Sequence, residues 1–163
     1  MMKGEARRKP AGLSRRPKVP RPPPPSSAAA TRSMKGNRAS GTTPERLLRA
    51  ALRDMGITRY ELNFRGIPGC PDVAFPSVRF AVFVHGCFWH RCPRHRWKVP
   101  KSNADYWRLK FASNRERDAR KVRALRRAGW AAVTLWECKI KRDPESCALA
   151  VQRRLLRREL NGA

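Results

Sequence analysis

The alternation of hydrophobic and polar positions predicts a small α/β domain. Apolar residues recur every three or four positions in three segments, which predicts helices at 43–55, 104–127 and 144–160. The helix at 104–127 is expected to form in two pieces. Four apolar or alternating segments are typical of strands: 60–64, 72–75, 80–84 and 130–136. The run Phe80–Val84 is continuously apolar, which favours a central strand covered on both faces. The order of elements predicts one mixed sheet flanked by helices.

The first 33 residues have a different pattern. They contain nine Lys or Arg, one acidic residue and seven Pro, and they lack apolar periodicity. Such a segment buries too little surface to offset the entropy of ordering. We therefore expect residues 1–33 to form a disordered basic arm and residues 34–163 to form the folded domain. The arm could make nonspecific phosphate contacts or be no more than a solubilising extension.

The charge balance narrows the choice of partners. The chain has 163 residues with 38 Lys and Arg against 12 Asp and Glu, a formal net charge of +26. This excess favours polyanionic partners, with nucleic acid first and an anionic membrane surface a distant second. No apolar run is long enough to span a bilayer, and no apolar stretch typical of a secretory signal follows the basic N-terminus. We expect a cytoplasmic, nucleoid-associated monomer.

A cluster of metal-binding residue types follows the strand at 80–84. Cys87, Cys92 and His95 are closely spaced, and Cys138 comes where the strand at 130–136 ends. Three thiolates and one imidazole suit tetrahedral Zn²⁺, and a full set of protein ligands indicates a structural site. The alternative is a set of scattered buried thiols. Cys147 lies on the apolar stripe of the last helix and is expected in the core.

Asp72, His85 and His90 form a second constellation. Asp72 begins one strand and His85 ends the next, so a short connection would bring both to one edge of the sheet. A carboxylate beside imidazoles, in a polycation, can hold Mg²⁺ against a phosphodiester while a neutral His takes a proton from water. Alternatively, the two histidines are satisfied loop residues or further zinc ligands.

Large aromatic residues occur in and after the same loop. Phe88, Trp89, Trp97 and Trp107 stand among basic residues, where aromatic rings can stack on bases or wedge between base pairs. They could equally cover the zinc site or pack as a lid.

These motifs together resemble those of the very-short-patch repair (Vsr) DNA mismatch endonucleases. The resemblance extends from about Arg32 to Ile140. It rests on Phe83-Val84-His85-Gly86-Cys87-Phe88-Trp89-His90, with Pro68-Gly69-Cys70-Pro71-Asp72 before it and Asn114-Arg115-Glu116-Arg117-Asp118 and Trp136-Glu137-Cys138 after it.

The resemblance implies a restriction-endonuclease-like core that nicks double-stranded DNA 5′ of the T in a T:G mismatch, the product of 5-methylcytosine deamination. Short-patch repair would follow, with a functional link to a cytosine-5 DNA methyltransferase. By resemblance, the Mg²⁺ ligands are Asp72 and the Val84 carbonyl. The resemblance also implies that the catalytic residues are Asp72, His85, His90, Asp118 and Glu45. The DNA-intercalating residues are Phe88, Trp89, Trp107 and Met34, and the structural zinc ligands are Cys87, Cys92, His95 and Cys138.

Two departures from the family pattern stand out. Cys92 and His95 occupy exchanged places among the zinc ligands, and the acid-x-Lys half of the wider nuclease motif is missing, with His85 in its place. Two rival functions also fit the sequence: a noncatalytic zinc-containing nucleic-acid-binding module, and a nickase with a different mismatch or sequence preference.

Overall fold

The computed structural model describes residues 19–24, 27–28, 31, 40–95 and 97–162. Its main helices are α2 (Thr43–Asp54), α3 (Ala104–Arg127), α4 (Glu137–Arg142) and α5 (Pro144–Leu160), with a 3₁₀ turn η1 (Pro76–Val78). Its strands are β1 (Glu61–Leu62), β2 (Val73–Phe75), β3 (Phe80–His85) and β4 (Ala131–Trp136).

The four strands form one mixed sheet in the order β1-β2-β3-β4. β2 is antiparallel to both β1 and β3, whereas β3 and β4 are parallel and pair from Phe80 with Ala131 to His85 with Trp136. The parallel pair needs a long crossover, and α3 supplies it. The α/β class with one mixed sheet flanked by helices, predicted from the sequence, is confirmed.

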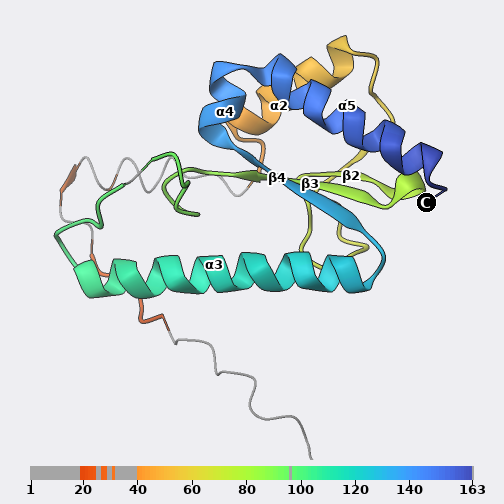
Figure 1. The fold of residues 1–163 in the computed structure, drawn as a ribbon. Helices are drawn as coiled ribbons and strands as arrows, with labels where there is room; N and C mark the ends of the chain where they lie inside the picture. Colours follow the sequence, from red (N-terminus) through yellow and green to blue (C-terminus); the bar gives the residue numbers. More distant parts are fainter. Residues whose placement is uncertain (1–18, 25–26, 29–30, 32–39, 96, 163) are drawn as a thin grey trace, which may run out of the picture.

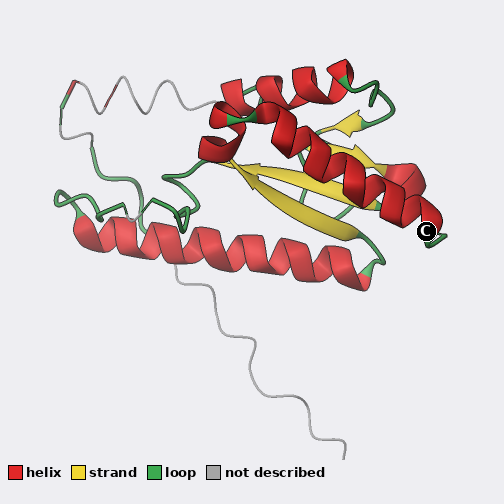
Figure 2. Ribbon diagram, turned by 45° about the horizontal axis from the view of Figure 1, so that its top comes forward, coloured by secondary structure: helices red, strands yellow, loops and turns green. Residues whose placement is uncertain are grey.

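Helices cover both faces of the sheet (Figures 1 and 2). Helices α2, α4 and α5 pack together on one face, and α3 crosses the other. Alternate residues of β3 point to the two faces of the sheet. Phe80 and Val82 belong to the larger core with α2 and α5, while Ala81 and Phe83 pack with Leu125 of α3. β3 is therefore covered on both faces, as its apolar run predicted. Cys147 is fully buried in the larger core, as expected.

Helix α3 is continuous over 24 residues, so the expected break is wrong. Residues 104–127 contain neither Gly nor Pro, and nothing in the helix interrupts its hydrogen-bond ladder. Its buried side chains, Phe111, Asn114 and Leu125, follow a helical stripe toward the sheet. Asp118 falls on this same stripe, which places a carboxylate where a core residue is usual.

Two other features differ from the predicted elements. The strand expected at 60–64 is reduced to the two residues of β1, an edge strand with one partner. Helix α4 was not predicted, and it places Cys138 in a helical first turn directly after β4. Most of the basic arm lies outside the described residues. No described helix has both the length and the apolar character to cross a membrane.

Candidate active site and metal cluster

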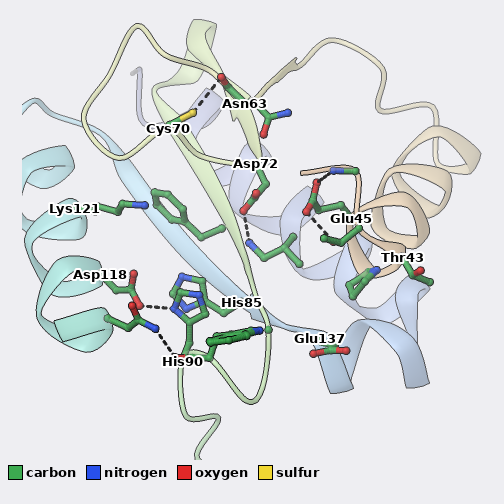
Figure 3. Close-up of a pocket in the computed structure, with 18 of the residues that line it drawn as sticks. Thr43, Glu45, Asn63, Cys70, Asp72, His85, His90, Asp118, Lys121 and Glu137 are labelled. Atoms are coloured by element: carbon green, nitrogen blue, oxygen red, sulfur yellow. Dashed lines mark hydrogen bonds and ion pairs between the residues drawn. The ribbon is translucent and has the colours of Figure 1, made fainter. Parts of the chain in front are cut away.

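A cleft of about 840 Å³ opens where β3 ends, between the start of α2 and the middle of α3. Five side chains predicted to be catalytic line it together: Glu45, Asp72, His85, His90 and Asp118. Figure 3 shows them converging from α2, β3, α3, the turn before β2 and the loop after β3. The sequence had placed Asp72 and His85 at one sheet edge, and the antiparallel pairing of β2 with β3 brings both to the cleft.

Asp72 is held at the edge of the sheet by the backbone of β3. The Val84 N–H donates to Asp72 Oδ2 over 2.6 Å. Burial raises the pKa of the Asp72 carboxyl from 3.8 to about 6, and the charge of Glu45 adds to the rise, although the Val84 hydrogen bond and Lys121 oppose it. Two carboxylates in a partly buried cleft repel each other, so the site favours a cation between them.

Glu45 is oriented by the residues just before α2. Gly41 N–H donates to Glu45 Oε2 over 2.8 Å, and the Thr42 hydroxyl donates to Glu45 Oε1 over 2.7 Å. Thr42 is the N-cap residue of α2, so both bonds come from the residues that lead into the helix. Glu45 is only 7 % exposed, so the cap holds its carboxylate in the cleft rather than in solvent.

His85 and His90 stack face to face, with ring centroids 3.9 Å apart and planes 16° apart. His90 Nδ1 lies 2.5 Å from Asp118 Oδ2. Burial alone would raise the pKa of Asp118, but the hydrogen bond and charge of His90 outweigh it and hold that pKa below 3.8. The carboxylate is thus ionised and accepts a hydrogen bond from Nδ1 of His90, which leaves Nε2 as the ring nitrogen that does not face Asp118.

His85 is neutral at physiological pH. Burial and, to a smaller extent, the neighbouring His90 lower its pKa from 6.5 to about 4, against the opposing charge of Asp118. A second positive imidazole stacked on the first would be repelled. His85 is therefore the uncharged ring of the stacked pair and adds no positive charge beside His90.

Two polar residues of the site, one buried and one partly exposed, were not predicted from the sequence. Asn114 of α3 is 4 % exposed, and its Nδ2 donates to the Trp89 carbonyl over 2.9 Å. Glu137 accepts from the Cys87 N–H over 3.1 Å and pairs with Lys141. Both residues belong to motifs that carried the family resemblance, but their partners lie far away in the sequence. The polar positions on the inward stripe of α3 were the available signal for Asn114.

Behind the His90 loop, the four predicted zinc ligands converge. The ligand atoms of Cys87, Cys92, His95 and Cys138 all lie within 4.8 Å of one another. Sγ of Cys92 and Sγ of Cys138 are 3.9 Å apart, close to the roughly 3.8 Å edge of a tetrahedron with metal–sulfur bonds of about 2.3 Å. The four residues can therefore hold a metal ion.

The protonation of the cluster also suits a metal. The buried Nδ1 of His95 has no hydrogen-bond partner among the described residues. Burial alone would raise the pKa of the Cys92 thiol, but hydrogen bonds from His95 and from the Arg94 backbone bring it down to about 7. A bound metal ion would satisfy the orphaned nitrogen and neutralise the thiolate.

Beside the cleft, the Phe88 ring meets Trp89, Trp107 and Phe111 edge-on, at centroid distances of 5.2 to 5.4 Å. Trp107 also stacks on Phe111 and contacts Trp89. All but Phe111 are partly exposed. Trp97 is outside this group, 47 % exposed and near His95. Met34 lies outside the described residues.

Comparison with known proteins identifies the class of enzyme. A family model described as DNA mismatch endonuclease Vsr matches residues 26–98. The type II nicking enzyme V.XorIIP of Xanthomonas oryzae pv. oryzae is 43 % identical over 63 % of this chain and 75 % of its own length. The type II nicking enzyme V.NaeI of Lentzea aerocolonigenes is 42 % identical over 71 % of each chain. The DNA mismatch endonuclease Vsr of Escherichia coli K12 is 31 % identical over 70 % of this chain and 72 % of its own length.

With this fold and this likeness, the protein is a DNA endonuclease of the restriction-endonuclease-like class. The chain belongs to the Vsr family of DNA mismatch endonucleases.

Proposed function

We propose that this endonuclease nicks one strand of double-stranded DNA on the 5′ side of the T in a T:G mismatch and so initiates very-short-patch repair. The observation that carries the proposal is the meeting of Asp72 and the His90–Asp118 pair in one cleft, beside a cluster of partly exposed aromatic rings. The relatives named nicking enzymes support cleavage of a single strand.

Asp72 and the backbone carbonyl of Val84 are the proposed ligands of Mg²⁺, with Glu45 near its waters. The Asp72 carboxylate fits a hard cation because it is partly buried and lies near the carboxylate of Glu45. The Val84 N–H occupies only Oδ2, so Oδ1 is available to the ion. The N–H and carbonyl of a strand residue point to the same side, so the Val84 carbonyl faces Asp72 too. When bound, Mg²⁺ supplies stabilisation of the charge that develops on the phosphodiester.

His90 is the proposed general base. Asp118 holds the proton on Nδ1, so Nε2 can accept a proton from the water whose oxygen attacks phosphorus. Neutral His85 stacks against that ring and fixes its plane. Asn114 and Glu137 hold the loop that carries His90, through the Trp89 carbonyl and the Cys87 N–H. The ester bond to the leaving oxygen then breaks, and that oxygen takes a proton from solvent.

Phe88, Trp89 and Trp107 are the proposed wedge beside the mismatch, and Met34 is expected to act from the opposite groove. A wobble pair stacks less well than a matched pair, so inserting a ring costs less there. Nonspecific affinity comes from phosphate contacts of the basic surface. Selectivity for the mismatch is then the difference in the free-energy cost of deforming a mismatched and a matched duplex.

A cytosine-5 DNA methyltransferase would be the functional partner, because deamination of the 5-methylcytosine it makes produces the T:G mismatch.

Zn²⁺ is the proposed occupant of the Cys87, Cys92, His95 and Cys138 cluster. Three sulfurs and one imidazole fill the four positions of tetrahedral Zn²⁺ and leave none for water, so the ion would be structural. It would tie the loop after β3 to the start of α4, and hence fix His90 relative to His85.

A strand-resolved cleavage assay tests the proposal. Duplexes carrying T:G, each other mismatch and a matched pair are incubated with Mg²⁺ at fixed salt, with Asp72→Ala as the inactive control. We expect a single nick 5′ of the mismatched T with wild type and none with the variant. Binding without cutting would instead support the noncatalytic module, and equal nicking of matched duplex would support a nickase of other preference.

A further inference from the structure

Lys121 of α3 is a cation of the cleft that the family motifs do not include. It follows Asp118 by three positions, so both side chains lie on the same face of the helix, and both line the cleft. Figure 3 shows Lys121 extending from α3 toward the strand that carries His85, across from Asp72.

The turn before Asp72 leaves room for this side chain. Gly69 has φ +99°, and a Cβ added there would lie 3.1 Å from Lys121 Cβ and 3.3 Å from the Phe83 ring. Such an approach is tighter than ordinary van der Waals contact, so a side chain at Gly69 would push the lysine stem aside. The Lys121 stem thus runs between the Gly69 turn and Phe83, and its Nζ lies 5.9 Å from the centre of that ring.

The Lys121 ammonium has no acidic partner among the described residues, whose ion pairs involve His90, Arg108 and Lys141. Its charge nevertheless acts on Asp72 and on His85. A half-buried ammonium without a counter-ion loses hydration and gains little in return. Its position is best explained by an anion that enters the cleft from outside.

We propose that the Lys121 ammonium binds a non-bridging oxygen of the phosphodiester that the enzyme cleaves. The inference deepens the proposed function and rests on it, because it takes the cleft as the place of cleavage. Non-bridging oxygens gain charge in the transition state, so a cation already in place stabilises that state more than the bound duplex. Lys121 therefore acts on the cleavage step rather than on affinity alone, unlike the basic residues of the outer surface.

Single-turnover cleavage with saturating protein separates these two roles. Lys121→Met removes the charge but keeps an unbranched stem against Phe83. The matched control is Arg123→Met, which removes a charge from an exposed position on the far side of the same helix. We expect Lys121→Met to lower the cleavage rate constant about 30-fold or more and to change the Kd for duplex less than about 3-fold. Lys121→Arg should recover part of the rate.

Several results would overturn this role. They are a rate constant unchanged in Lys121→Met, a loss confined to Kd, or an equal loss of rate in Arg123→Met. Thermal unfolding of each variant checks that the fold is intact. If Lys121→Met does not fold, the role of Lys121 is tested by the cleavage rate of Lys121→Arg and by the acetylation of wild-type protein described below.

Lysine acetylation provides a readout that needs no cleavage. Wild-type protein is treated with an amine-acetylating reagent, free or bound to T:G duplex in Ca²⁺, and Lys121 is quantified by mass spectrometry. Protection of Lys121 by the duplex is expected, and full reactivity in the complex would refute the phosphate contact. If wild type nicks no duplex yet Lys121 is protected, the proposed function fails while the contact stands. Nicking with an unprotected Lys121 refutes the contact alone.

Discussion

Replacing Asp72 with asparagine is expected to stabilise the fold near neutral pH while abolishing cleavage. Burial raises the pKa of Asp72 from 3.8 to about 6. The unfolded chain ionises this carboxyl near 3.8, so between that pH and about 6 the folded protein binds more protons. Stability of the wild type therefore falls as the pH rises through this window.

The size of the effect follows from the shift. A difference of roughly two pKa units at about 1.4 kcal/mol each makes the ionised carboxylate cost up to about 3 kcal/mol above pH 6. Asparagine keeps an oxygen for the Val84 N–H, so the bond seen at 2.6 Å need not be lost. We expect a net gain of about 2 kcal/mol, or roughly 6 °C in Tm for a domain of this size.

Thermal unfolding in buffer freed of added divalent ions measures this gain at about pH 7.5. It is measured again at about pH 3.5, below the pKa of the unfolded chain, where the carboxyl is largely protonated in both states and the difference should nearly vanish. Added Mg²⁺ should raise the Tm of the wild type and not that of Asp72→Asn. Asp105→Asn is the control, because that carboxylate is 92 % exposed. A variant no more stable than wild type at the higher pH, or a gain independent of pH, would refute the reasoning.

Three further predictions concern other parts of the molecule. Freshly purified protein should contain about one zinc per chain by elemental analysis, and Cys138→Ser should lose it together with several kcal/mol of stability, because metal binding contributes folding free energy; finding no zinc in wild type removes the site. Asp118→Asn should lower kcat roughly 10²-fold or more with little change in duplex affinity, because His90 loses the partner that fixes its tautomer; unchanged kcat contradicts the assignment. Deleting residues 1–31 should weaken binding to all duplexes alike and flatten the dependence of log K on log salt, whereas an unchanged slope would show that the arm makes no phosphate contact.

Local sequence pattern was sufficient for much of the fold. The apolar run of β3 predicted a strand covered on both faces, because burial on both faces removes the polar alternation that a half-exposed strand would keep. Close spacing likewise predicted the Cys87, Cys92 and His95 part of the metal cluster, since these ligands need only a short loop to meet. The expected break in α3 was wrong, because residues 104–127 contain no Gly or Pro that would interrupt a helix.

What the chain determined by itself was thus the set of elements and the identity of the chemical groups at their ends. Which groups meet was decided by the tertiary structure: the parallel pairing of β3 with β4 sets Glu137 against the Cys87 N–H, and the crossing of α3 under the sheet brings Asn114 and Lys121 into the cleft. These contacts span tens of residues and are specified by packing of whole layers, which no local period of the sequence encodes.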